Sequence, residues 1–166
     1  QSLPWQEVFV YSVRLWAVRH AGAFERIYKA FEPVLVKLHP LWKAVGYERM
    51  EGPMVAVEKA CKGLLFDCKM CGQCALSSTG MSCSMNCPKN LRNGPCGGVR
   101  LNGNCEVYAD RRCVWVEAWN GSRKMKDGDK IFNVQKPVSF NQQGTSSWLR
   151  VVRMIATDKD SQAKEL

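Results

Sequence analysis

Eight cysteines lie within 46 residues of this 166-residue chain, and no histidine falls among them. They are Cys68, Cys71, Cys74, Cys83, Cys87, Cys96, Cys105 and Cys113. The first three form a Cys-x2-Cys-x2-Cys run, and the fifth is followed by Pro88. Ferredoxins hold iron–sulfur clusters with a C-x2-C-x2-C-x3-C-P run whose last cysteine often serves the other cluster. The pattern therefore predicts two 4Fe–4S clusters, each on four thiolates, and hence electron transfer.

Two other interpretations use the same residues. Two zinc ions would also need eight thiolates, but zinc modules usually pair two separated Cys-x2–4-Cys knuckles per site, which a triplet followed by longer gaps does not resemble. A disulfide framework is typical of secreted chains, whereas the total of nine cysteines is odd and no secretion signal is recognisable. The spacing leaves open which cysteines share a site. We expect the triplet to join one more distant cysteine.

Helices are expected to position this module. Apolar side chains recur at helical spacing through residues 1–60, with Pro33 bending or restarting one helix and a short helix over 54–61. Asp110 is expected to cap the start of a helix that bears Cys113, and Thr145-Ser146-Ser147 to cap a last helix over 148–155. The pair Asn102-Gly103 predicts a type I′ turn in a small hairpin over 99–107.

The predicted fold class is mainly α, with an irregular cysteine-rich metal-cluster module and a small β-hairpin. We divide the chain into a helical N-terminal arm (1–60), a cysteine-rich iron–sulfur module (61–120), and a polar linker with a C-terminal docking tail (121–166). Gly72, between Cys71 and Cys74, is expected to let the backbone approach a cluster closely. Cys61 is expected to be a buried structural thiol.

Charge and hydropathy narrow the classes of partner. The formal net charge is +9, and two four-iron clusters on eight thiolates would lower it to about +5. That excess suits an acidic redox protein such as ferredoxin, and the spread of Lys and Arg along the chain makes nucleic acid a poor candidate. No apolar run approaches the roughly 18 residues of a membrane span. We expect a cytoplasmic chain without a membrane partner.

The cysteine-rich segment resembles a known family in long stretches of sequence. These are Cys68-Lys-Met-Cys71-Gly-Gln-Cys74, Cys83-Ser-Met-Asn-Cys87-Pro, Asn93-Gly-Pro-Cys96-Gly-Gly, Gly103-Asn-Cys105-Glu-Val, Cys113-Val-Trp115 and the closing Gly144-Thr-Ser-Ser-Trp148-Leu. Over about residues 60–120 the chain resembles the methylenetetrahydrofolate reductase C-terminal domain family. One departure is Cys83-Ser84, where the family commonly has Cys-Pro.

The resemblance implies a small iron–sulfur subunit that accompanies a flavin-containing methylenetetrahydrofolate reductase catalytic subunit. All eight cysteines from Cys68 to Cys113 would be cluster ligands, and the flavin and folate would reside on the partner. The sequence contains no nucleophile–base pair, phosphate-binding loop or dinucleotide fingerprint, so we expect no catalysis by this chain alone. The implied function is electron relay between an external redox partner and the flavin. The alternatives are a zinc-binding structural or nucleic-acid-binding module, and clusters that only scaffold the reductase.

Overall fold

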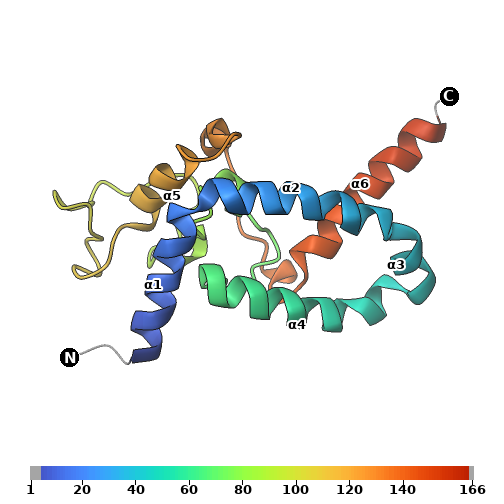
Figure 1. Cartoon of the computed structure of the whole chain (residues 1–166), viewed down its shortest axis with the longest axis horizontal. Helices are drawn as coiled ribbons and strands as arrows, with labels where there is room; N and C mark the ends of the chain where they lie inside the picture. The colour runs from blue at the N-terminus through green and yellow to red at the C-terminus, as the bar shows by residue number, and fades with distance from the viewer. Residues whose placement is uncertain (1–4, 165–166) are drawn as a thin grey trace.

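Helices dominate the computed structural model, which describes residues 5–164. The first four follow one another almost without loops: α1 (Trp5–Arg19), α2 (Ala21–Lys37), α3 (His39–Val45) and α4 (Tyr47–Phe66). In Figure 1, α2 and α4 run along opposite sides of the molecule, and α3 joins them at one end. The mainly α prediction is confirmed. Residues 1–4 of the predicted N-terminal arm and residues 165–166 of the predicted docking tail lie outside the described residues.

Two prolines lie inside helices, including Pro33, which the sequence predicts to bend or restart one. Pro33 is within α2 and Pro53 within α4, and the helix predicted over 54–61 is the middle of the 20-residue α4. The ends of both helices are anchored in packed cores, through Leu35 of α2 and Phe66 of α4. This packing explains why the two helices continue past residues that disfavour them, because tertiary contacts supply most of a helix's stability in a protein.

The C-terminal third contributes α5 (Val114–Ser122) and α6 (Ser147–Lys164), with short 3-10 helices η3 (Gly128–Phe132) and η4 (Phe140–Gln142) between them. Helix α5 begins after Cys113, so the predicted start at Asp110 is wrong. Helix α6 begins where Thr145-Ser146-Ser147 indicates, and the Ser146 hydroxyl accepts a hydrogen bond from the Leu149 N–H at 3.2 Å. Leu149 and Val152 of α6 then pack with Leu35 and Trp42 in one apolar core.

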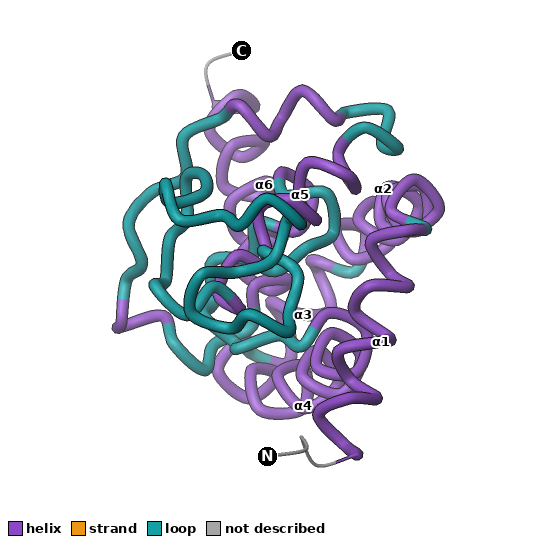
Figure 2. The backbone as a smooth tube through the Cα atoms, turned by 90° about the vertical axis from the view of Figure 1, so that its left-hand side faces the viewer, coloured by secondary structure: helices purple, strands orange, loops and turns teal. Residues whose placement is uncertain are grey.

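The cysteines lie in a long irregular segment between α4 and α5, broken only by the 3-10 helices η1 (Leu76–Ser78) and η2 (Ser84–Asn86). Figure 2 shows these loops gathered on one side of the helices. They are fastened to α5 by close backbone contact: a Cβ on Gly121 would lie 2.0 Å from the carbonyl oxygen of Gly80. Glycine at position 121 is therefore required by space.

The predicted β-hairpin is wrong, since no strand forms among the described residues. The chain turns one residue earlier than expected, with the Gly103 N–H donating to the Arg100 carbonyl at 2.8 Å. The following residues pair with a later segment: the Cys105 N–H bonds to the Arg111 carbonyl at 2.9 Å, and the Cys113 N–H to the Gly103 carbonyl at 3.0 Å. These bonds hold the backbones of Cys105 and Cys113 side by side.

The polar segment before α6 runs over the cysteine loops as a strap. The Asn93 side chain bonds both the N–H (2.6 Å) and the carbonyl (3.0 Å) of Gln135, and the Gln73 carboxamide accepts from the Ser139 N–H at 2.7 Å. Gly72 makes room for this strap: a Cβ there would lie 2.2 Å from the Gln142 carbonyl oxygen. The glycine thus serves contact with the C-terminal segment of the same chain.

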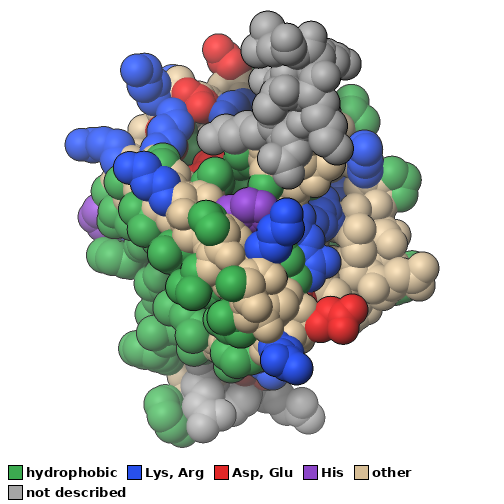
Figure 3. Space-filling model, turned by 90° about the vertical axis from the view of Figure 1, so that its right-hand side faces the viewer, with side chains coloured by type: hydrophobic (Ala, Val, Ile, Leu, Met, Phe, Trp, Pro, Cys, Tyr) green, Lys and Arg blue, Asp and Glu red, His purple; other side chains and the backbone are tan. Residues whose placement is uncertain are grey.

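The surface mixes basic and apolar areas. Figure 3 shows Lys and Arg side chains gathered around a histidine, and His39, Lys43, Arg49 and Arg153 line an open hollow between α3, α4 and α6. Exposed apolar side chains include Trp5, Phe9, Ile27, Val34, Val57 and Leu64. Within the described part of the chain, none of the helices has the length and apolar character needed to cross a membrane.

Candidate metal centres

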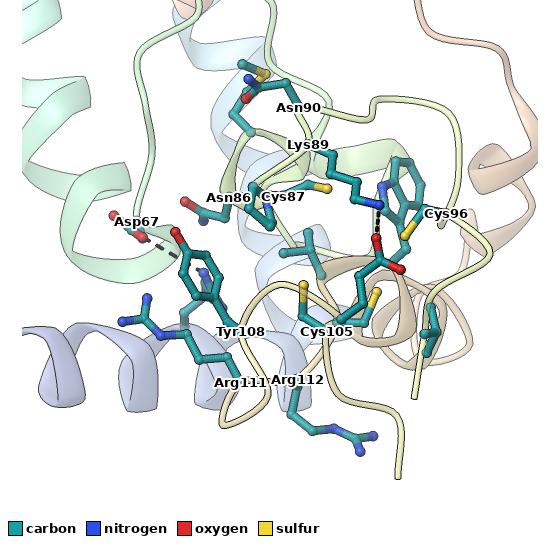
Figure 4. A pocket seen from close by; sticks show the side chains of 18 of the residues that line it. Asp67, Asn86, Cys87, Lys89, Asn90, Cys96, Cys105, Tyr108, Arg111 and Arg112 are labelled. Carbon is teal, nitrogen blue, oxygen red and sulfur yellow. Dashed lines mark ion pairs between the residues drawn. The ribbon is translucent and has the colours of Figure 1, made fainter. Parts of the chain in front are cut away.

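The structure divides the eight cysteines into two groups of four. Cys68, Cys71, Cys74 and Cys83 line one cavity of about 20 Å³. Cys87, Cys96, Cys105 and Cys113 line a second cavity of about 290 Å³. In Figure 4 the side chains of Cys87, Cys96 and Cys105 extend toward a common space. The triplet therefore joins Cys83, and Cys87, four residues later, belongs to the other group.

Backbone turns shape the start of the first group. Asp67 and Met70 adopt left-handed conformations, with φ of 50° and 48°, which reverse the chain directly after α4. The Met70 N–H then lies 3.4 Å from the Cys68 sulfur. Backbone N–H groups directed at ligand sulfurs stabilise their negative charge and are one means of setting a cluster's reduction potential.

Ionisation of the first group is electrostatically unfavourable without a bound cation. Burial, and then the nearby sulfur of Cys68, raise the pKa of the Cys83 thiol to about 12. Burial likewise raises the pKa of the Cys68 thiol. A metal ligand must be a thiolate, so four ionised sulfurs at this place require the charge of a metal centre.

One buried arginine lines the first cavity and has spare hydrogen-bonding capacity. The Arg92 Nη1 lies 3.9 Å from the Cys71 sulfur, and its Nη2 donates to the Gln73 carbonyl at 3.1 Å. Its Nε is buried without a hydrogen-bond partner among the described residues. A guanidinium with an unused N–H beside four thiols is suited to a centre that carries sulfide or thiolate charge.

A buried ion pair forms another wall of the first cavity. Glu58 and Lys62, one turn apart on α4, are only 2% and 5% exposed and bond at 2.7 Å. The Lys62 ammonium also donates to the Ser147 hydroxyl at 2.8 Å, and the Ser146 hydroxyl donates to Glu58 at 2.7 Å. Burial opposes both charges, yet the attraction of Lys62 lowers the pKa of Glu58. Cys74 and then Glu58 raise the pKa of Lys62 against the same burial.

Basic side chains surround the second cavity. Arg14 of α1 enters it with its guanidinium 3.9 Å from the Asp67 carboxylate, and burial lowers the Arg14 pKa despite that partner. Lys89 forms an ion pair with Glu106 across the same cavity (Figure 4). Lys69, Arg111 and Arg112 complete the cationic lining. Each of these cations also pairs with a carboxylate, so the cavity is lined by a set of ion pairs.

The donor sets fit a metal that prefers thiolates, either zinc or an iron–sulfur cluster. Among the described His, Cys, Asp and Glu side chains, no three are arranged to hold a single ion. Four thiolates on one zinc lie within about 4.6 Å of one another, twice the Zn–S bond, whereas a four-iron cluster binds each thiolate through a different iron. The second cavity has room for a cluster. The first holds roughly one water-sized atom, so a cluster there requires its loops to open.

The remaining candidate ligands lie elsewhere. Cys61 is exposed on α4 and lines neither cysteine cavity, so its predicted burial is wrong. His20 bonds to the Trp16 carbonyl on α1, and His39 to the Tyr47 hydroxyl near α3. Sequence reasoning did not find Arg92 or the Glu58–Lys62 pair. The only signals were the four-residue acid–base spacing on α4 and the Ser146-Ser147 pair that meets it.

Comparison with known families fits this geometry. The family model described as methylene-tetrahydrofolate reductase C terminal matches residues 47–141. The chain belongs to this family. The match includes all eight grouped cysteines, Glu58, Lys62 and Arg92. It is longer than the 60–120 resemblance but ends before the Gly144-Thr-Ser-Ser-Trp148-Leu stretch. No curated protein and no solved structure matches the chain. Because the chain belongs to this family, it is related to methylenetetrahydrofolate reductase.

Proposed function

We propose that this chain is the iron–sulfur electron-transfer subunit of a methylenetetrahydrofolate reductase complex. It would relay electrons between an external redox partner and the flavin of the catalytic subunit, which would also bind the folate. The observation that supports this most directly is the division of the cysteines into two sets of four in a member of this family. We also propose a cytoplasmic complex, because cysteine thiols stay reduced in that compartment.

In this proposal Cys68, Cys71, Cys74 and Cys83 hold one 4Fe–4S cluster, and Cys87, Cys96, Cys105 and Cys113 hold the other. Such clusters supply one-electron chemistry when bound. The chain's own residues set the surroundings: Arg92 and Lys62 place positive charge beside the first group, and Arg14 beside the second. Fixed positive charge stabilises the more negative, reduced state of a centre. The basic rim of the second cavity suits an acidic redox protein such as ferredoxin.

Metal analysis of the anaerobically purified complex tests the proposal. We expect about eight iron and eight sulfide per chain, and loss of about half of both in Cys113→Ser. Cys61→Ser is the matched control and should retain all of the iron, since Cys61 lines neither group. Mixing the reduced chain with the oxidised flavoprotein should then reduce the flavin in a single turnover.

A zinc-binding structural module is the second candidate function. The small volume of the first cavity favours it, because one zinc ion needs less space than a four-iron cluster. Stoichiometric zinc without sulfide would establish this alternative and remove the electron relay. A third outcome is a variant that keeps its iron and sulfide but shows no cluster redox signal. Full reductase activity in such a variant would indicate clusters that only scaffold the enzyme.

A further inference from the structure

A basic hollow of about 700 Å³ lies at the α3 end of the molecule, away from the cysteine loops. None of the nine cysteines lines it, so the centres proposed above do not account for it. Its basic side chains come from three helices: His39 and Lys43 from α3, Arg49 from α4 and Arg153 from α6. Figure 3 faces this end and shows Lys and Arg side chains around a histidine.

The cations of the hollow are not neutralised by carboxylates. Among the described residues, no Asp or Glu lies within ion-pair distance of Lys43, Arg49 or Arg153. The second cysteine cavity differs, because every cation there has such a partner. Glu48 is the one described carboxylate that lines the hollow, so three cations against one carboxylate leave two positive charges in excess. Like charges gathered in one place repel one another, and a bound anion relieves that repulsion.

The hollow is built on packed helices. Trp42 of α3 is buried with Leu149 and Val152 of α6, and Tyr47 at the start of α4 packs against the same core. This core fixes the three helices relative to one another. The Arg153 guanidinium lies over the Tyr47 ring, 4.4 Å from its centre, and this contact holds the cation at the wall of the hollow. An anion would therefore meet a charge that is already in place.

Tyr47 also determines what His39 can offer to a ligand. The Tyr47 hydroxyl and the His39 Nδ1 lie 2.5 Å apart. Burial raises the pKa of Tyr47 although Arg153 opposes the shift, so the hydroxyl keeps its proton at neutral pH. When that hydroxyl donates to Nδ1, the neutral imidazole carries its own proton on Nε2. His39 then adds an uncharged N–H donor to the three cations of the hollow.

The number of donors favours a phosphate group over a carboxylate. Two guanidiniums, one ammonium and one imidazole line the same hollow. A carboxylate presents two oxygens, whereas a phosphate monoester presents three terminal oxygens and close to two negative charges at neutral pH. Arginine suits such a group because its planar fork donates two parallel hydrogen bonds. The donor set and the two positive charges in excess match a phosphate dianion, and the remaining volume accommodates the organic group that carries it.

We propose that this hollow binds the phosphate group of a phosphate monoester. The inference is independent of the proposed function, because the hollow contains no proposed cluster ligand. The phosphate has two possible sources, a free organic phosphate or the headgroup of a membrane lipid. In the second case the bilayer would also contact exposed apolar side chains along α2 and α3, one of which lines the hollow. These are Val34, Leu38, Leu41 and Val45.

Calorimetric titration of the purified chain with phenyl phosphate, a simple phosphate monoester, tests the inference at constant ionic strength. We expect saturable binding that Arg49→Gln and Arg153→Gln each weaken about tenfold or more, since each removes charge-assisted hydrogen bonds. Lys59→Gln is the matched control: Lys59 lies on α4 with Arg49, is likewise exposed and does not line the hollow. Phthalate, which carries two carboxylates on the same ring, should bind more weakly than phenyl phosphate.

Co-sedimentation with phosphatidylcholine vesicles, prepared with and without phosphatidic acid, distinguishes the two sources. If a lipid supplies the phosphate, the chain should sediment only with vesicles that contain phosphatidic acid, and Leu41→Ser should reduce sedimentation without weakening phenyl phosphate binding. If a free molecule supplies it, the chain should stay in solution with both kinds of vesicle. Absence of saturable phenyl phosphate binding, equal losses in Arg49→Gln and Lys59→Gln, or equal binding of phthalate would overturn the inference.

Discussion

Removing the Glu58 carboxylate tests the buried ion pair that supports the first cysteine group. In Glu58→Ala the Lys62 ammonium keeps only the Ser147 hydroxyl at 2.8 Å and the face of the Trp148 ring, whose centre is 4.9 Å away. Lys62 is 5% exposed, so water cannot replace the lost carboxylate. The variant leaves a buried charge without its counter-ion and two serine hydroxyls without their shared acceptor.

The expected cost follows from that burial. Breaking a buried pair by deleting one partner typically costs about 3–5 kcal/mol, and the lost hydrogen bonds from Ser146 and Ser147 place this case in the upper part of the range. For a domain of this size, each kcal/mol lowers Tm by roughly 2–4 °C. Glu58→Ala should therefore lower Tm by roughly 10–15 °C. The double variant Glu58→Leu/Lys62→Met removes both charges and should recover most of the loss.

Urea or thermal unfolding of protein with matched metal content measures both effects. Glu48→Ala on the same helix is the control, because Glu48 is exposed and should cost no more than about 1 kcal/mol through the helix dipole. A cost below about 1 kcal/mol for Glu58→Ala, or a double variant as unstable as the single one, would refute the reasoning that α4 and α6 are joined through a compensated buried charge.

Three further predictions concern charge, space and pH. With the proposed cluster bound in the first group, Arg92→Met should lower its reduction potential by on the order of 100 mV in a spectroscopic redox titration. A unit charge about 6 Å away contributes about 3 kcal/mol at an effective dielectric of 20, and Arg26→Met, at an exposed position, should have no such effect. Gly121→Ala should lower the free energy of unfolding by about 1–3 kcal/mol or more in urea denaturation, because its Cβ would clash with Gly80. Gly63→Ala has open space around its Cβ and should instead raise that free energy by up to about 1 kcal/mol. The pKa of Tyr28, raised by burial to about 12 in the folded chain, stabilises the folded state below the unfolded value of about 10. That contribution disappears as pH rises to about 12, so the urea midpoint of Tyr28→Phe should fall less over this range than that of the wild type.

Local patterns predicted the helices more reliably than the loops. The apolar stripes of α1 and α2 and the Thr-Ser-Ser start of α6 were sufficient to place those helices. The short helix predicted over 54–61 and the hairpin predicted at Asn102-Gly103 were wrong, because contacts made elsewhere decided the outcome. The longer α4 is anchored through Phe66, and the Cys105 N–H bonds to Arg111 instead of across the turn.

The candidate ligands were identifiable from sequence, but their partition was not. Cys83 and Cys87 are neighbours in sequence yet line different cavities, which no spacing rule distinguishes. The Glu58–Lys62 pair looks like an ordinary surface pair on a helix. The pair is buried because Ser146 and Ser147, more than 80 residues later in the chain, cover it and form hydrogen bonds with both charges.

The short link between Cys83 and Cys87 also has a consequence for assembly. Four residue steps span at most about 14 Å between the two Cα atoms, and the 3-10 helix η2 between them shortens that reach. Once Cys83 is bound in the first group, the position of the Cys87 backbone is restricted before any metal binds to the second group. The two proposed clusters should therefore be loaded in an interdependent order, and loss of either one should disturb the other group through this single stretch of backbone.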